Sequence, residues 1–255
     1  MPTPSLITRD LTIRFGGHVA VNAVSCAFHP GELTVIVGPN GAGKTTYFNL
    51  ISGQLAATSG QVMKGDVDLT RMAPSTRARQ GVGRAFQLTN LFPQLSVLEN
   101  IRLAVQARAG DGWRLLRPVS RFTGLIRDAE HYLEAARLTR VAHLPAAALP
   151  HGDQRKLEVA LLMAMEPDIY MFDEPTAGMS LDHAPDVLDL IGQIKSDPTK
   201  TVLLVEHKME VVRRLADRII VLHNGELLAD GPPDQVMNSQ IVRDVYLGTA
   251  TEETA

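Results

Sequence analysis

Short continuous apolar runs, separated by longer mixed stretches, dominate the hydrophobic pattern of the chain. Four of them are rich in branched residues: LTVIV (33–37), IYMF (169–172), TVLLV (201–205) and RIIVL (218–222). Continuous apolar runs of this length are typical of strands buried on both faces, as in a parallel sheet with helical connections. The pattern therefore predicts an α/β core built on such a sheet.

The first thirty residues follow an alternating pattern instead. Leu11, Ile13 and Phe15 alternate with polar residues, glycines at 16–17 provide a hairpin turn, and a second turn is expected at 30–31. Alternation predicts antiparallel strands with one buried face. Phe15 is compatible with two roles: it shares the face of Leu11 and Ile13 and could pack in the core, or it could stack on a base.

Residues from about 97 to 165 carry helical periodicity, in stretches such as DAEHYLEAARL and DQRKLEVALLMAM, and contain few strand signals. This pattern predicts a helical subdomain inserted into the α/β core. We therefore expect a single domain over residues 1–255, with the core formed by 1–96 and 166–255 and the helical subdomain by 97–165.

Composition narrows the classes of function. A net charge of -3 over 255 residues gives no electrostatic footprint for nucleic-acid binding, so no nucleic-acid partner is expected. The single cysteine, Cys26, cannot form an intramolecular disulfide, and we expect it to fill core space in a reducing compartment. No apolar stretch approaches the ~20 residues of a membrane-spanning helix, and the N-terminus lacks the pattern of a signal peptide.

The segment GPNGAGKTT (38–46) follows the first buried run and precedes an apolar helix expected from about Lys44. It matches G-x-x-x-x-G-K-[ST], in which glycines let backbone N–H groups turn toward phosphates and the helix N-terminus adds its positive end. Lys44 would reach the β- and γ-phosphates, and the Thr45 hydroxyl would ligate Mg²⁺. The predicted fold is a P-loop NTPase core with a mixed sheet, an N-terminal antiparallel β-subdomain and an inserted helical subdomain. The candidate ATP-binding residues of the loop are Gly38, Pro39, Asn40, Gly41, Ala42, Gly43, Lys44, Thr45 and Thr46.

Two acids end the apolar run that leads to MFDE (171–174). Open α/β sheets bind ligands at the carboxyl ends of their strands, which is where Asp173 and Glu174 are expected. Asp173 would hold Mg²⁺, directly or through water, and Glu174 would polarise the attacking water as a general base. The alternative is that both acids cap a helix that begins in EPTAG.

Two further polar residues are weaker candidates. Gln87 follows GVGRAF and could sense Mg²⁺ or the attacking water, although an isolated glutamine is more often a surface residue. His207 follows the run TVLLV by two residues, on the same carboxyl edge, and could donate to the γ-phosphate. No cluster of histidines, acids or cysteines has the spacing of a zinc site made by the protein alone.

Together these segments resemble the ATP-binding cassette (ABC) family, in particular the ATPase subunits of bacterial branched-chain amino-acid importers. The resemblance extends over nearly the whole chain and is carried by GPNGAGKTT, GRAFQ, LPHGDQRKLEVA, MFDEPTAG, VEH and NGELLADGPPDQV with YLG. It implies that Gln87 belongs to a glutamine loop, Gly152 to a signature segment that contacts ATP, and His207 to a histidine switch. It also implies that Phe15 stacks on adenine.

The resemblance further implies ATP and Mg²⁺ as cofactors and a peripheral location on the cytoplasmic face of the inner membrane. In that family two ATPase subunits pair head to tail below membrane-spanning permease subunits, and a periplasmic binding protein delivers the substrate. This sequence departs from the family pattern at Pro150, where serine is usual, and at Ser180, where an acid or asparagine is usual. Because a homodimer would be weakened at both sites, we expect pairing with a second, different ATPase subunit, with a homodimer as the alternative.

The predicted function is therefore an ATP-hydrolysing subunit of an importer for branched-chain or related amino acids, with urea or amides as alternative cargo. Two other functions remain open on the sequence: a soluble ABC ATPase outside transport, and a regulatory nucleotide-binding subunit with little turnover. The intact Glu174 argues against the regulatory subunit, whereas Pro150 argues mildly for it.

Overall fold

The computed structural model describes residues 3–85, 91–110, 123–179 and 184–244 of the chain. It contains two compact units. The first comprises Met1–Val82, Asp168–Glu174 and Lys195–Ala255, and the second comprises Gly83–Pro167 and Pro175–Ile194. The chain thus leaves the first unit and re-enters it twice.

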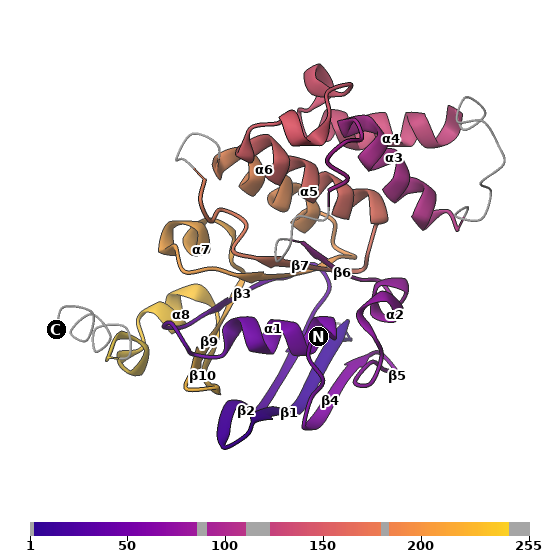
Figure 1. The fold of residues 1–255 in the computed structure, drawn as a ribbon. Coiled ribbons are helices and arrows are strands. Elements are labelled where there is room, and N and C mark those ends of the chain that lie inside the picture. Colours follow the sequence, from indigo (N-terminus) through magenta and orange to yellow (C-terminus); the bar gives the residue numbers. More distant parts are fainter. Residues whose placement is uncertain (1–2, 86–90, 111–122, 180–183, 245–255) are drawn as a thin grey trace. The chain divides into compact units, whose positions relative to one another are not determined.

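An antiparallel sheet of four strands forms one part of the first unit. It consists of β1 (Leu6–Phe15), β2 (His18–Phe28), β4 (Ser59–Lys64) and β5 (Val67–Asp68), in the order β2-β1-β4-β5. Figure 1 shows the long strands β1 and β2 side by side, joined by the short turn that the two glycines predicted. The expected N-terminal antiparallel subdomain is confirmed.

Phe15 does not pack in the core, so one of the two roles predicted for it is wrong. Its side chain is 50% exposed, whereas Leu11 and Ile13 are buried. The pairing of β1 with β2 shifts between Thr8 and Leu11 and again on both sides of Ile13. Such irregularities change which face a residue occupies, so the alternation does not continue to the end of the strand.

The second sheet is mixed, as predicted. Its order is β10-β9-β3-β8-β7-β6, formed by β3 (Leu33–Val37), β6 (Val82–Ala85), β7 (Ile169–Asp173), β8 (Thr201–Val205), β9 (Arg218–His223) and β10 (Glu226–Gly231). Strand β3 pairs in parallel with β8 and β9, β7 pairs in parallel with β8, and β10 is antiparallel to β9. Every residue of β3, β7 and β8 is buried, which explains why these segments are continuous apolar runs. At β6 the chain passes from the first unit to the second.

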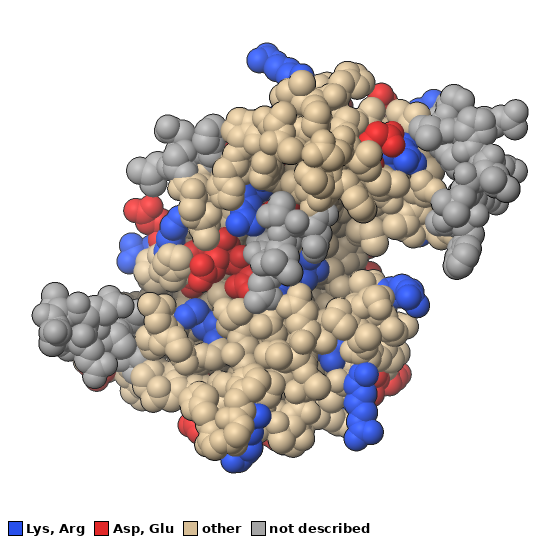
Figure 2. Space-filling model, in the orientation of Figure 1, with Lys and Arg blue, Asp and Glu red and all other residues tan. Residues whose placement is uncertain are grey.

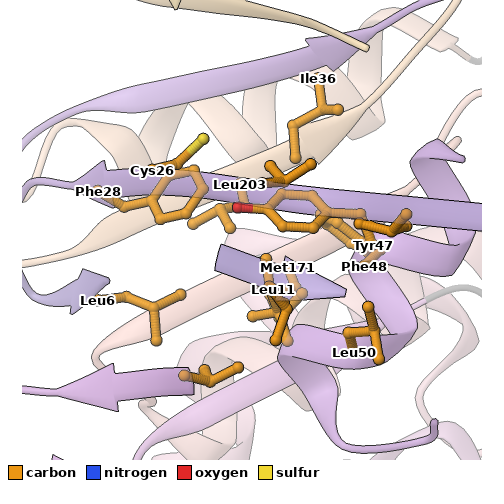
Figure 3. Packing of buried hydrophobic residues seen from close by; sticks show 14 of the residues in the cluster. Leu6, Leu11, Cys26, Phe28, Ile36, Tyr47, Phe48, Leu50, Met171 and Leu203 are labelled. Atoms are coloured by element: carbon orange, nitrogen blue, oxygen red, sulfur yellow. The ribbon is translucent and has the colours of Figure 1, made fainter. Parts of the chain in front are cut away.

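Helix α1 (Lys44–Ser52) supplies the centre of the hydrophobic core of the first unit. In Figure 3 its Tyr47 and Phe48 lie among residues of both sheets, including Leu11, Phe28, Met171 and Leu203. The Tyr47 hydroxyl, although buried, is satisfied by a hydrogen bond of 2.7 Å with the Thr8 hydroxyl, as buried polar groups require. The core therefore fixes the helix that begins at the candidate phosphate loop.

Cys26 lies in the same core, as expected from the sequence. Burial raises the pKa of its thiol to about 11, so the thiol stays protonated and unreactive at neutral pH.

A buried arginine fixes the other end of α1. Arg77, in helix α2 (Pro74–Arg79), donates to the carbonyl oxygens of Leu50 and Ile51 at 2.6 Å and to that of Thr70 at 2.8 Å. It is 2% exposed, and burial lowers the pKa of its guanidinium. The bonds to Leu50 and Ile51 reach carbonyl groups of the last turn of α1, where helix carbonyls lack i+4 partners; the Gly53 N–H also donates to that of Leu50, at 3.3 Å. Two short helices, α7 (Met209–Leu215) and α8 (Pro233–Met237), complete the first unit.

The described part of the second unit is mainly helical. It contains α3 (Val97–Arg108), α4 (Thr123–Ala135), α5 (His151–Met165) and most of α6 (Ala184–Lys195), with 3₁₀ turns at Thr139–Val141 and Ala146–Ala148. Helices α3, α4 and α5 pack against one another (Figure 1). Arg108 of α3 forms an ion pair with Glu166 at the end of α5 and donates to the Tyr132 hydroxyl of α4 at 2.9 Å. One polar cluster thus joins all three helices.

On the face drawn in Figure 2, the lysines and arginines of the described residues lie in separate small groups among acidic and uncharged ones. No continuous basic area is visible on that face in the described part of the chain. None of the helices in the described ranges has the length and apolar character needed to cross a bilayer.

Candidate functional site

The loop between β3 and α1 is shaped by close approach of neighbouring backbone. A Cβ on Gly38 would lie 2.2 Å from the carbonyl oxygen of Leu222, and a Cβ on Gly43 would lie 2.5 Å from that of Ala20. Real side-chain carbons do not tolerate such distances, and Gly43 also has a left-handed φ of +92°. The sequence motif explains these glycines by phosphate binding, because glycine lets backbone N–H groups turn toward a phosphate. The structure adds that the protein's own packing requires two of them.

The N-terminus of α1 is open to an anion. The helix begins at Lys44, as predicted, and its N-cap residue Gly43 makes no side-chain capping bond. The first turn contains no acidic residue, and Thr45 in that turn is exposed. The first N–H groups of a helix have no partner within it, and the helix dipole favours negative charge there. This end of α1 is therefore suited to phosphate.

The Lys44 ammonium lies within the loop. Its Nζ donates to the carbonyl oxygens of Gly38 at 2.7 Å and Pro39 at 2.9 Å, and the residue is 8% exposed. Burial lowers the pKa of Lys44, while the negative charges of Glu174 and Asp173 oppose that shift. The loop, its lysine and the two acids therefore belong to one electrostatic site.

The strand register explains why the acids reach this site. Val205 of β8 pairs with Ile36 of β3 on one side and with Asp173 of β7 on the other. The phosphate loop and the two acids consequently emerge at the same edge of the sheet, one strand apart. Asp173 is 8% exposed, whereas the Glu174 side chain is 40% exposed. The buried carboxylate of Asp173 is thus suited to bind a metal, and the accessible carboxylate of Glu174 is suited to contact water.

The alternative interpretation of the two acids, as caps of a following helix, is wrong. Residues 175–178 form turns, and the next described helix begins at Ala184. Glu174 instead donates its N–H to the carbonyl oxygen of Val205 at 3.0 Å and has a left-handed φ of +50°. Such a backbone is uncommon outside glycine and is concentrated at functional sites.

His207 lies beside Glu174, as its position after β8 suggested. Its Nδ1 is 3.7 Å from Oε1 of Glu174, just beyond hydrogen-bond distance, and its side chain is 55% exposed. A small movement would bring the two groups into a hydrogen bond, and both remain accessible to a ligand.

The sequence interpretation missed Glu206. This acid is 1% exposed, and its Oε2 accepts the N–H groups of His207 at 2.9 Å and Lys208 at 3.1 Å. The carboxylate thereby fixes the backbone that carries the histidine. The available signal was an acid directly after a buried strand.

The oxygen donors present fit Mg²⁺. The Thr45 hydroxyl and the Asp173 carboxylate are hard ligands, and Mg²⁺ commonly uses one or two protein oxygens together with substrate phosphates and water. Within the described ranges, no group of three or more histidines, cysteines, aspartates or glutamates is placed to hold a metal. The donor set therefore favours a metal shared with a phosphate ligand over a cage made by the protein.

The other predicted residues lie elsewhere. Phe15, at the end of β1, is exposed in the first unit, which leaves stacking on a base as its predicted role. Gly152 is the second residue of α5 in the second unit, and Pro150 is the N-cap of that helix. Gln87 and Ser180 lie outside the described residues.

Residues 21–177 match the family model described as ABC transporter. Residues 226–252 match a second model, described as branched-chain amino acid ATP-binding cassette transporter. The second match covers β10 and α8, whereas the first covers the phosphate loop and both acids.

Three known proteins illustrate the similarity. The high-affinity branched-chain amino acid transport ATP-binding protein LivG of Escherichia coli (strain K12) is 36% identical over 263 residues, which cover 98% of this chain and 100% of LivG. The ADP conformation of MJ1267, an ATP-binding cassette of an ABC transporter, superposes with a TM-score of 0.82 at 25% identity and covers 96% of this chain and 99% of its own. A dimeric cassette, MJ0796 in a post-hydrolysis state bound to ADP and Pi, has a TM-score of 0.73 at 26% identity, with 89% and 98% covered.

Proposed function

The chain belongs to the ABC transporter family of ATP-binding proteins, and on this premise we propose that it hydrolyses ATP to drive an importer of branched-chain amino acids. The observation that carries the proposal is the combination of two matches. The nearly full-length similarity to LivG supports the ATPase subunit of an amino-acid importer, and the match of residues 226–252 supports the branched-chain type. Neither a soluble ATPase outside transport nor a regulatory subunit is favoured by these relatives.

The phosphate loop binds the triphosphate in this proposal. Backbone N–H groups at the start of α1 contact the phosphate oxygens, and Lys44 exchanges its bonds to the loop carbonyls for bonds to the β- and γ-phosphates. The position of its ammonium inside the loop supports this role. Phe15 stacks on the adenine ring.

Glu174 takes a proton from the attacking water, whose oxygen bonds to the γ-phosphorus as the bond to ADP breaks. The exposure of its carboxylate at the strand edge and its proximity to Lys44 support this role. His207 donates to the γ-phosphate from beside Glu174, and Glu206 holds the histidine backbone in place. Gln87 would contact the metal and the attacking water.

Thr45 and Asp173 would hold Mg²⁺, which would neutralise charge on the phosphate oxygens. The hard oxygen donors at this edge support that assignment.

The partners follow from the family. As an ABC transporter ATPase, the chain works as a dimer with membrane-spanning permease subunits, and the dimeric state of MJ0796 supports the pairing. We propose that the second ATPase subunit is a different chain, that the complex lies on the cytoplasmic face of the inner membrane, and that a periplasmic binding protein delivers the substrate. Gly152 would then contact the ATP of the partner ATPase.

The decisive experiment is to purify the chain with its native membrane complex and to identify the other subunits. We expect two permease subunits, a second ATPase, and ATP turnover that rises when a binding protein loaded with leucine, isoleucine or valine is added. Glu174→Gln should still bind MgATP but lose roughly 100-fold or more of the turnover, which is the usual value of general-base catalysis. A chain that purifies without membrane subunits, or turnover that responds to urea and not to amino acids, would contradict the proposal.

A further inference from the structure

A hairpin near the end of the chain lies against both ends of the phosphate loop. In its turn, the N–H of Gly225 donates to the carbonyl oxygen of Ala42 at 3.1 Å. A Cβ on Gly43 would lie 3.3 Å from the Cα of Gly225, and a Cβ on Gly38 would lie 2.2 Å from the carbonyl oxygen of Leu222. The β9–β10 hairpin therefore contacts the loop where it leaves β3 and where it enters α1.

The same turn is attached to β2. The carbonyl oxygen of Gly225 accepts the N–H of Asn22 at 2.8 Å, and Nδ2 of Asn22 donates to Oε1 of Glu226 at 2.8 Å. A Cβ on Gly225 would lie 2.7 Å from the carbonyl oxygen of Ala20, the same atom that leaves no room for a Cβ on Gly43. The hairpin, the loop and β2 thus meet at one point without space for a side-chain carbon on either glycine.

A loop rich in glycine has little intrinsic shape, because each glycine has many accessible backbone conformations. Gly41, in the middle of the loop, has no atom of a described residue other than its chain neighbours within 4 Å of a Cβ position, so the described contacts that restrain the loop lie at its ends. A binding loop that is already held in its bound shape loses less entropy when the ligand binds.

We infer that the β9–β10 hairpin holds the phosphate loop in its binding shape and that Gly225 is a positioning residue for nucleotide binding. The inference deepens the proposed function and rests on it, since it concerns the same ATP site. It assigns the hairpin, more than 170 residues from the loop in sequence, a role in ATP affinity.

The test is MgATP affinity in the full-length chain, measured by titration calorimetry in a Glu174→Gln background that prevents turnover. Gly225→Ala should force the turn away from β2 and break its bond to Ala42, and we expect MgATP to bind at least tenfold more weakly. Gly65→Ala is the matched control, because Gly65 also has a left-handed φ, of +54°, but among the described residues only its chain neighbours come within 4 Å of its Cβ position. It carries the same kind of backbone strain without the contact, so its affinity should stay within twofold of the parent.

A milder pair of variants covers the case in which Gly225→Ala does not fold. Glu226→Ala removes the exposed bond to Asn22 and should weaken MgATP binding about two- to threefold. Asp66→Ala removes an exposed acid beside the control glycine and should leave binding unchanged. Circular dichroism and the unfolding midpoint without nucleotide show that each compared variant is folded.

A folded Gly225→Ala protein that binds MgATP as tightly as Gly65→Ala would overturn the inference. If Gly225→Ala is unfolded, equal affinities of Glu226→Ala and Asp66→Ala would overturn it. Failure of the proposed function has a different signature: a failed ATP site would leave the parent chain itself unable to bind MgATP, and a failed importer role would appear in the subunits that co-purify and not in these affinities.

Discussion

Helices α1 and α5 begin in similar ways but suit an anion to different degrees. Neither N-cap residue, Gly43 or Pro150, makes a side-chain capping bond. The first turn of α1 contains no acid, whereas that of α5 contains Asp153. A carboxylate in the first turn interacts with the same partial positive charge that would attract a phosphate.

The acid of α5 also has a partner of its own. Lys156 lies 2.6 Å from Oδ1 of Asp153 and 3.7 Å from Oδ2 of Asp186 in α6. The start of α5 is therefore stabilised within its own unit, while the start of α1 has no such internal partner among the described residues. In the proposed function, we therefore expect this chain to bind ATP mainly through its own loop and to contribute only weakly, through α5, to the ATP of a partner subunit.

The largest effect is expected from a change in the phosphate loop at the start of α1, the stronger of the two sites. Lys44→Ala removes a charged donor from the loop, and we expect MgATP affinity to fall about 10- to 100-fold, since bonds to charged groups contribute roughly 1.5–3 kcal/mol. Titration of the purified chain measures it. The control is Lys200→Ala, a lysine that precedes β8 at the opposite edge of the sheet. Equal affinities of the two variants would show that the loop does not bind the triphosphate.

The next effect strengthens the weaker site. Pro150→Ser supplies an N-cap hydroxyl, and ATP-dependent dimer closure in a Glu174→Gln background should improve roughly tenfold, about 1.4 kcal/mol. MgATP affinity of the monomer should change little, because α5 contacts the partner's nucleotide in this proposal. Pro150→Ala, which lacks the hydroxyl, should not show the gain. If the serine variant closes no better at any ATP concentration, the assignment of LPHGDQ as a signature segment is wrong.

A third helix start serves as a structural reference. Ser96 caps α3 by accepting the N–H of Glu99 at 3.2 Å, so Ser96→Ala should lower the free energy of unfolding by about 1 kcal/mol. Because this cap serves the helix alone, MgATP affinity should be unchanged. Chemical denaturation and nucleotide titration of the same sample check both statements. A loss of MgATP affinity would show that the Ser96 cap does not serve the helix alone.

The smallest effect isolates the acid of α5. Asp153→Asn removes one negative charge from the first turn of α5. It should lower the free energy of unfolding by about 0.3–1 kcal/mol, because the interaction of the carboxylate with the helix dipole and with Lys156 is lost. Dimer closure with ATP should improve two- to threefold, opposite in sign to the change in stability. Glu130→Gln, on the exposed face of α4, is the control for a change of net charge. Closure that weakens along with stability would contradict the comparison.

Much of the core was predictable because its signals are local. The runs 33–37 and 201–205 coincide with β3 and β8, and the loop motif predicted where α1 begins. The two acids, Asp173 as the last residue of β7 and Glu174 directly after it, were also placed correctly at the carboxyl end of the strand, because the carboxyl ends of parallel strands meet there. The functions of individual side chains remain predictions.

The sequence by itself determined the buried strands, the phosphate loop and the group of charged residues that the carboxyl edge brings together. These follow from hydrophobic period and motif spacing, which involve neighbours along the chain. Only the tertiary structure decided that Phe15 is exposed, that Glu206 is buried, and that Gly38 and Gly43 are required by the backbone of Leu222 and Ala20. Each of these depends on register shifts or on contacts between segments distant in sequence, and no local pattern encodes the distance at which two such segments will meet.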